Sequence, residues 1–127
     1  TDRRANLMNC DNDGRLTKVW LGYLELSGTM PTRIGELEQL RVLSLASQRL
    51  HGTLPTELQQ LLHLRELWAR ENFFHGELPA LSALTRLEVV SLERNHLSGT
   101  LGARHVPPRV RTLFLQENYL WGDVDGA

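Results

Sequence analysis

Residues 64–79 read LRELWARENFFHGELP, and this stretch decides the fold because its pattern returns along the whole chain. Leucine stands at its first and fourth places, Asn72 at the ninth, Gly76 at the thirteenth and Pro79 at the sixteenth. The general form is L-x-x-L-x-L-x-x-N-x-L-x-G-x-L-P. Positions within a repeat are numbered below from 1 at the first leucine.

The pattern occurs five times at nearly constant spacing. The repeats start at Leu16, Leu40, Leu64, Leu87 and Val110, which are 24, 24, 23 and 23 residues apart. Position 13 is glycine every time, at Gly28, Gly52, Gly76, Gly99 and Gly122. Such a period is the signature of a repeat architecture. We therefore predict a repeat domain over residues 16–127, preceded by a partial N-terminal cap over residues 1–15.

The residues at positions 4, 6, 9 and 13 show why each repeat needs its neighbours. Positions 4 and 6 face inward because side chains alternate along a strand, and one repeat alone cannot bury them. The glycine permits a turn with positive φ. An Asn at position 9 can bond the backbones of two repeats, as Asn72, Asn95 and Asn118 would. Leu24 and Gln48 stand there in the first two repeats, which predicts an imperfect ladder at the N-terminal end.

This pattern resembles the leucine-rich repeat family, and its G-x-L-P element resembles the plant-specific type. The resemblance implies an α/β fold: a right-handed solenoid with a parallel concave sheet of about five strands. A second short strand and a 3₁₀ or irregular turn would follow in each repeat toward the convex side. Variants such as Gly122-Asp123-Val124-Asp125, without the proline, look like those of protozoan surface and secreted repeat proteins.

The segment before the first repeat, ANLMNCDNDGRLTKVWL, resembles the second half of a plant-type N-terminal cap. The resemblance implies a disulfide from the cap cysteine to an upstream partner. Cys10 is the only cysteine, so either the chain was cut or the thiol is free. The start at Thr1 without Met also suggests a processed or trimmed piece.

The residues from Asn9 to Gly14 imitate the start of a calcium-binding EF-hand loop. The twelfth place of such a loop must be a bidentate Glu, but here it is Trp20. Asp13-Gly14 is instead a signal for a hairpin turn. We therefore predict a hairpin and no calcium site.

No arrangement of residues predicts catalysis, a metal or a cofactor. Cys10 has no histidine nearby in sequence that could activate it. His51 and His75 share position 12 of adjacent repeats, so we expect them about 5 Å apart, the spacing of strands. Two imidazoles without a third ligand make a poor zinc site. The chain is thus predicted not to be an enzyme.

The charge balance gives no sign of a polyanionic partner. The formal net charge is −1, and no basic stripe is visible along the sequence. No apolar run approaches the length of a transmembrane span. We expect neither nucleic acid nor membrane contact for this segment.

The outward positions of the concave face carry the candidate binding residues. Position 5 alternates aromatic and serine side chains, and charged or aromatic residues stand at positions 7, 8 and 10. Aromatic residues with a charged surround are typical of interface hot spots. The candidate protein-binding residues are Trp20, Tyr23, Trp68, Arg70, Glu71, Phe73, Arg94, Phe114 and Tyr119.

Two further expectations concern contacts between repeats. Opposite charges predict pairing of Arg70 with Glu93, and of Arg94 with both Glu71 and Glu117. Ala69 is the one small residue at an inward strand position, and Phe74 replaces the leucine found at position 11 of the other repeats. We predict that Phe74 fills the space beneath Ala69.

These patterns favour a protein–protein interaction module that binds an unidentified protein on its concave face. One alternative is a structural or oligomerising spacer of a larger surface or secreted protein, with self-association through the uncapped C-terminal end over residues 110–127. Another alternative, implied by the resemblance, is an inhibitor of a secreted hydrolase. The resemblance also favours an extracellular or cell-surface location.

Overall fold

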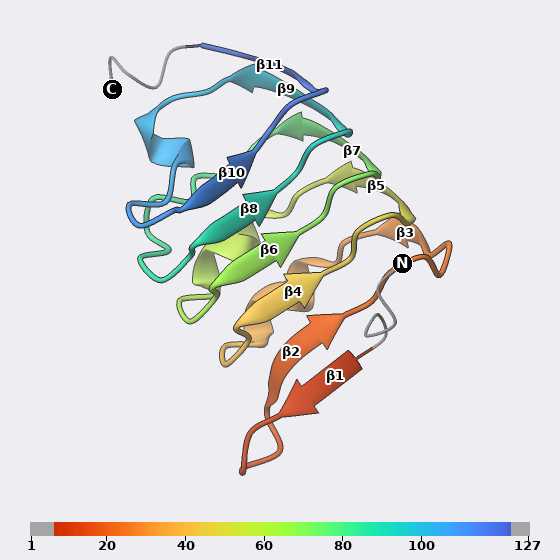
Figure 1. Ribbon diagram of the computed structural model, residues 1–127, viewed down its shortest axis with the longest axis vertical. Helices are drawn as coiled ribbons and strands as arrows, with labels where there is room; N and C mark the ends of the chain where they lie inside the picture. Colours follow the sequence, from red (N-terminus) through yellow and green to blue (C-terminus); the bar gives the residue numbers. More distant parts are fainter. Residues whose placement is uncertain (1–6, 123–127) are drawn as a thin grey trace.

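The computed structural model describes residues 7–122, which form two sheets joined by turns in every repeat, with the strands of successive repeats parallel. Figure 1 shows the repeats stacked along the long axis, with the hairpin at one end. The first sheet has the strand order β1-β2-β4-β6-β8-β10. Its strands are β1 Leu7–Cys10, β2 Leu16–Trp20, β4 Val42–Ser44, β6 Glu66–Trp68, β8 Val89–Ser91 and β10 Thr112–Phe114.

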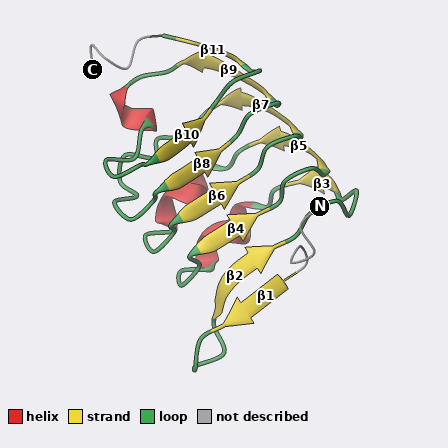
Figure 2. Cartoon of the chain, viewed as in Figure 1, coloured by secondary structure: helices red, strands yellow, loops and turns green. Residues whose placement is uncertain are grey.

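The second sheet is built from the second short strand of each repeat, in the order β11-β9-β7-β5-β3. Its strands are β3 Ser27–Thr29, β5 Arg49–Thr53, β7 Phe73–Glu77, β9 His96–Thr100 and β11 Tyr119–Trp121. Within residues 7–122, the helical content is limited to three 3₁₀ turns, η1 Thr32–Glu36, η2 Thr56–Gln60 and η3 Ala103–His105. In Figure 2 the first sheet faces the viewer, and the 3₁₀ turns lie behind it or to one side. The predicted parallel sheet of five repeat strands is confirmed.

The N-terminal segment forms the predicted hairpin. Strand β1 pairs antiparallel with β2, while every other strand pair of the first sheet is parallel. The Asp11 carboxylate accepts hydrogen bonds from the backbone N–H groups of Asp13 and Arg15, at 2.9 Å each. Gly14 has φ +79°, as a tight turn requires. A single carboxylate oxygen, Asp11 Oδ1, therefore holds the turn, and Cys10 beside it is an exposed free thiol.

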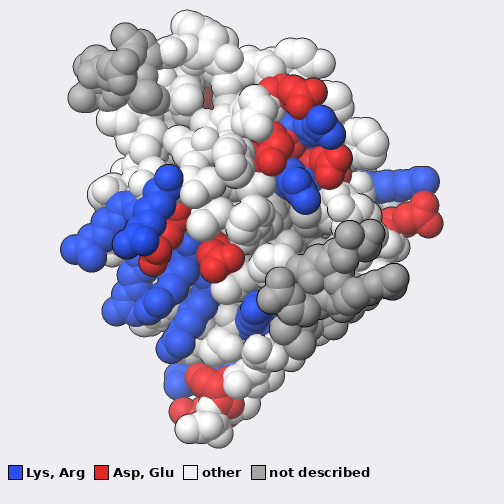
Figure 3. Space-filling model, viewed as in Figure 1, with Lys and Arg blue, Asp and Glu red and all other residues white. Residues whose placement is uncertain are grey.

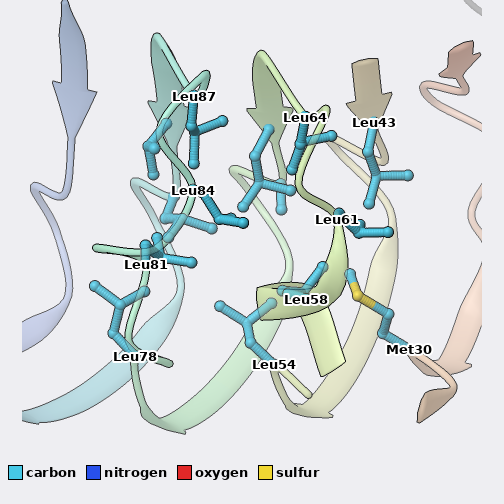
Figure 4. Close-up of a cluster of buried hydrophobic side chains, with 14 of the residues drawn as sticks. Met30, Leu43, Leu54, Leu58, Leu61, Leu64, Leu78, Leu81, Leu84 and Leu87 are labelled. Atoms are coloured by element: carbon cyan, nitrogen blue, oxygen red, sulfur yellow. The ribbon is translucent and has the colours of Figure 1, made fainter. Parts of the chain in front are cut away.

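Leucines fill the space between the sheets. Figure 4 shows leucines of adjacent repeats in matching rows, with Leu54 and Leu78, Leu58 and Leu81, and Leu61 and Leu84 at equivalent places. Three of these six side chains have no exposed surface, and none of the six is more than 3% exposed. Ala69 and Phe74 are also fully buried in the same cluster, which is compatible with the larger ring filling the space left by the alanine. Stacking thus buries what no single repeat could bury.

A ladder of buried amides runs along the core at position 9. The Asn95 carbonyl accepts from the Phe74 N–H at 3.0 Å, and its amide donates to the carbonyls of Ala69 at 3.0 Å and Leu92 at 3.1 Å. Asn72 and Asn118 make equivalent bonds in their repeats.

The ladder is imperfect at the N-terminal end, as predicted, but only at Leu24, and the expectation that Gln48 does not take part is wrong. The Gln48 side-chain carbonyl accepts from the N–H groups of Leu24 and Leu26, at 3.0 Å each. Its amide donates to the carbonyls of Leu21 and Ala46, at 3.2 Å each. The extra methylene of glutamine is accommodated, so the ladder extends over four repeats. Only Leu24, which is 45% exposed, leaves its repeat without an amide.

Two positions of every repeat adopt positive φ. The position-13 glycines have φ between +82° and +127°, as predicted. Position 8 also has positive φ, although no glycine stands there: Tyr23, Ser47, Glu71, Arg94 and Glu117 have φ from 57° to 61°. A side chain in this left-handed region is strained by roughly 1–2 kcal/mol. Because these residues do not favour this conformation by themselves, we infer that the stacking of the repeats imposes the left-handed backbone at position 8.

Within residues 7–122, no helix has the length and hydropathy needed to cross a membrane. The departure from the repeat pattern at residues 123–125 lies outside the described residues.

Candidate functional site

The candidate residues divide between the first sheet, the turn after it and the second sheet. Trp20, Trp68 and Phe114 end strands β2, β6 and β10. Phe73 and Tyr119 instead begin strands β7 and β11 of the second sheet. The turn holds the remaining four residues, Tyr23, Arg70, Glu71 and Arg94. The prediction that all nine lie on one strand surface is therefore wrong, because position 10 follows a turn.

The two tryptophans of the first sheet form a pair although one strand separates them. Ser44 of β4 lies between Trp20 and Trp68 in the strand register and is 3% exposed. The small serine leaves room for the indole rings, whose centroids are 6.0 Å apart and tilted by 50°. The alternation of large and small residues at position 5 thus builds a half-buried aromatic surface.

Polar neighbours fix this aromatic pair from the same face. The Trp68 indole N–H donates to the Glu66 carboxylate at 2.9 Å. The Lys18 ammonium lies over the Trp20 ring, 5.4 Å from its centroid, which is a cation–π distance. Sequence reasoning missed Lys18 and Glu66. They occupy position 3, two residues before each tryptophan, and side chains two residues apart share one face of a strand.

Phe114 extends the face to the last strand of the first sheet and is 40% exposed. Ser91 lies between Trp68 and Phe114 in the register and is fully buried. Its hydroxyl donates to the Glu93 carboxylate at 2.6 Å. The row at position 5 therefore runs from Trp20 to Phe114 with serines as spacers.

A column of polar side chains at position 8 borders this face. Arg94 donates to Glu117 at 2.8 Å and to Glu71 at 3.3 Å, as predicted. The Ser47 hydroxyl donates to the other Glu71 oxygen at 2.8 Å. This hydrogen bond and the nearby charges of Arg70 and Arg94 hold the pKa of Glu71 below its ordinary value. The two carboxylates, Glu117 foremost, raise the pKa of Arg94.

The predicted pairing of Arg70 with Glu93 is wrong. Glu93 accepts the Ser91 hydroxyl instead, and none of the ion pairs within 4.0 Å among residues 7–122 joins it to Arg70. The Arg70 Nε–H is buried and has no hydrogen-bond partner in that part of the chain. Beside it lies a hollow of about 190 Å³, lined by Arg70, Glu71, Glu93, Arg94, Gln116 and Glu117.

Position 10 forms a separate column on the second sheet. The rings of Phe73, His96 and Tyr119 are stacked with centroids 6.0 Å apart and planes within 15° of each other. The column continues to an ion pair between Arg49 and Glu25 at 3.1 Å. The two outer rings of this column are exposed, Phe73 by 51% and Tyr119 by 66%.

His51 and His75 were expected to lie side by side on adjacent strands, but the strand register does not pair them. His51 lies opposite Phe73, and His75 lies opposite His96. The ladder of the second sheet is displaced by two residues from the alignment of equivalent positions. Over residues 7–122 there is no group of three or more His, Cys, Asp or Glu side chains arranged to hold a metal ion.

The sequence shows no basic stripe, but in the folded chain basic side chains gather on one surface, so the prediction that the chain has none is wrong. Figure 3 shows basic side chains gathered beside the loops that lead into the first-sheet strands, and a mixed acidic and basic patch beyond the opposite strand ends. The basic residues stand about one repeat apart in the sequence. Only stacking at the period of the repeat brings them together.

The comparison with solved structures finds many similar chains. A chain of the BIR3–SERK2 complex from Arabidopsis thaliana superposes with a TM-score of 0.81 at 25% identity, over 89% of this chain and 63% of that one. The plant peptide hormone receptor RGFR1, in complex with RGF2, gives 0.81 at 34% identity, over 84% and 18%. A plant ice-binding protein gives 0.78 at 27% identity, over 91% and 39%.

The chain spans less than two thirds of the length of these structures. No family model matches its sequence, and no curated protein matches it either. The repeat pattern, the two parallel sheets and the likeness to plant receptor ectodomains agree with one another. The chain is a leucine-rich repeat protein with repeats of the plant-specific type.

Proposed function

We propose that this chain is a protein-interaction module that binds an extended peptide or a protein segment across its first sheet. The observation that carries the proposal is the row of Trp20, Trp68 and Phe114 on one solvent-facing surface, with the two indoles 6.0 Å apart. Large aromatic side chains give much contact area at low conformational entropy, which is why they dominate interface energetics.

The hollow beside Arg70 supports a polar contact next to the aromatic row. Arg70 lines this hollow, and no ion pair within 4.0 Å among residues 7–122 engages its guanidinium group, so the group is free to donate to a ligand that accepts hydrogen bonds. We propose that a carbonyl of the bound segment fills this role. The neighbouring carboxylates disfavour an anionic ligand there, so a backbone or amide carbonyl is the better match.

The likeness to solved complexes supports a peptide or protein partner. The similar structures include RGFR1 in complex with RGF2 and a crystal structure of PEPR1–AtPEP1. This chain covers 18% and 15% of those chains, so what it binds is proposed from its own surface. Five first-sheet strands of the repeats span about 20–25 Å. A surface of this length suits a short extended segment.

A peptide selection followed by paired variants tests the proposal. Peptides would be selected from a random display library on the immobilised chain, and the Kd would be measured by fluorescence anisotropy. We expect Trp68→Ala or Phe114→Ala to weaken binding at least tenfold, as for an interface hot spot. Phe73→Ala and Tyr119→Ala are the matched controls, because they remove exposed aromatic rings from the second sheet only.

Circular dichroism and an unfolding curve would confirm that each variant is folded. If Phe73→Ala weakened binding as much as Trp68→Ala, the first-sheet face would not be the binding surface. Equal affinity of all four variants and the parent chain would contradict the proposal as a whole.

A further inference from the structure

The basic side chains at the start of the first-sheet strands stand in two rows. One row takes position 2 of successive repeats and contains Arg65, Glu88 and Arg111. The backbone locks this row, since the Glu88 N–H donates to the Arg65 carbonyl and the Arg111 N–H donates to the Glu88 carbonyl, at 2.8 Å each. The other row takes the residue before position 1 and contains His63, Arg86 and Arg109.

The two rows converge because the residue between them points inward. Leu64 and Leu87, at position 1, are fully buried, and Val110 packs against the same core. The side chains before and after them are therefore turned to solvent together. They enclose a hollow of about 470 Å³, lined by Arg65, Thr85, Arg86, Glu88, Arg109 and Arg111.

The charge of this hollow is strongly unbalanced. It contains four guanidinium groups and one carboxylate, a formal charge of 4 − 1 = +3 in a chain whose net charge is −1. Among the described residues, the one ion pair here within 4.0 Å joins Arg111 to Glu88 at 3.6 Å. Arg86 lies 2.7 Å from the Nδ1 of His63, and none of the ion pairs within 4.0 Å among residues 7–122 joins it to a carboxylate.

We propose that this hollow is a binding site for a tetrahedral oxyanion of the phosphate or sulfate type. Guanidinium groups present paired N–H donors in a planar fork, which matches two oxygens of such an anion. Four of them around one hollow can surround the oxyanion from several sides. Thr85 also lines the hollow, and its hydroxyl is a further potential donor. No binding on the first-sheet face is needed for this site to act.

Its dimensions favour a small oxyanion over a polymer. Arg65 and Arg111 are two strand spacings apart, or about 10 Å. No aromatic ring lines the hollow to stack on a nucleobase, and Glu88 interrupts the row. The same oxyanion could arrive as a free ion or as a group on a peptide partner.

Glu88 makes the proposed site testable, because removing its charge should change the anion affinity in the opposite direction to removing an arginine charge. Its carboxylate pairs with Arg111 at 3.6 Å and would repel an anion that enters the hollow. Neutralising this side chain should therefore strengthen anion binding, whereas neutralising any of the surrounding arginines should weaken it. A surface that attracts anions only through its average charge would respond equally to charge changes elsewhere.

Isothermal titration calorimetry with inorganic phosphate, and separately with sulfate, tests the site at constant ionic strength set by chloride. We expect Arg65→Gln and Arg109→Gln to weaken phosphate binding at least fivefold and Glu88→Gln to strengthen it. Arg33→Gln is the matched control, since Arg33 lies on η1 with an 82% exposed side chain and the substitution changes net charge equally. That control should stay within twofold of the parent chain.

A phosphoserine peptide and its unphosphorylated form distinguish the two sources. Tighter binding of the phosphopeptide than of inorganic phosphate, sensitive to Arg109→Gln, supports a group carried on a peptide. Equal or weaker peptide binding supports a free ion. The proposal is overturned if neither ligand binds better than chloride, if Arg33→Gln weakens binding as much as Arg109→Gln, or if a single-stranded oligonucleotide binds while phosphate does not.

Discussion

Positions 8 and 9 of each repeat are neighbours in sequence but differ in burial, in hydrogen-bond partners and in backbone conformation. Position 9 holds the buried amides of Gln48, Asn72 and Asn95 and the partly buried amide of Asn118, whose bonds go to backbone groups of two repeats. Position 8 holds Ser47, Glu71, Arg94 and Glu117, which bond one another near the surface with positive φ. One column therefore satisfies the backbone, and the other presents charge.

The difference shows how a repeat separates stability from recognition. The buried amides satisfy donors and acceptors that water cannot reach, so their removal leaves unpaired groups in the core. Exposed ion pairs contribute little because solvent screens them. The position-8 side chains are therefore free to vary with a partner, while the position-9 amides are restricted by the fold.

Asn95→Ala should produce the largest loss of stability. It leaves the Phe74 N–H and the carbonyls of Ala69 and Leu92 without their side-chain partner in the core. We expect the free energy of unfolding to fall by about 2–4 kcal/mol. Urea denaturation measures it, with Glu117→Ala as the comparison at below about 1 kcal/mol. Similar losses in both variants would break the contrast between the two columns.

Phe74→Leu tests how the core beside the ladder is packed. Phe74 and Ala69 are both fully buried, and leucine cannot fill the volume of the ring. We expect a loss of about 1–2 kcal/mol from the smaller side chain and the cavity it leaves. Thermal unfolding followed by circular dichroism measures the effect. An unchanged midpoint would show that Phe74 does not fill the space beneath Ala69.

Arg94→Ala and Arg94→Gly separate backbone strain from ion pairing at position 8. Both variants lose the bonds to Glu71 and Glu117, but only glycine relieves the left-handed conformation at φ 61°. The glycine variant should therefore be more stable than the alanine variant by about 1 kcal/mol. Denaturant unfolding at one temperature compares them. Equal stabilities would mean that the turn relaxes when the charge is removed.

His105 is a buried polar side chain outside the ladder and gives the smallest effect. Its Nδ1 accepts the Gly102 N–H at 2.9 Å, while its buried Nε2 has no partner within residues 7–122. Burial, and then the charge of Arg104, lower its pKa below the ordinary value of 6.5. The folded state thus binds protons less readily than the unfolded state. Stability should fall as the pH drops below about 6.5.

The same pH series on His105→Gln provides the control. This variant should lose the part of the pH dependence that lies just below 6.5, whereas His75→Gln, on the exposed side of β7, should keep it. A parent chain whose unfolding free energy rises on acidification in this range would contradict the assignment.

The repeat register could be predicted from the sequence because inward leucines and turn glycines are set by local rules. The pairing of Arg94 with Glu71 and Glu117 followed from the same register. The role of Gln48 could not, because it depends on whether the turn accepts one more methylene. The basic hollow also escaped sequence analysis. Its arginines are scattered along residues 65–111, and only the stacking of repeats collects them.

The first-sheet face and the second sheet were also merged in the sequence-based prediction. Strand alternation predicts outward positions but not where the chain turns, so Phe73 and Tyr119 were assigned to the wrong surface. The structure separates the two surfaces: the paired indoles lie on one sheet and the stacked rings on the other. The proposed binding face is accordingly narrower than the nine candidates.

Tryptophan fluorescence tests the central claim, that partners bind the first-sheet face, most directly. The chain has three tryptophans, and Trp121→Phe leaves only Trp20 and Trp68, both on that face. On titration with a display-selected peptide, we expect the emission change to persist in Trp121→Phe with an unchanged Kd. Loss of the signal in this variant, with binding retained by calorimetry, would place the partner elsewhere and contradict the account.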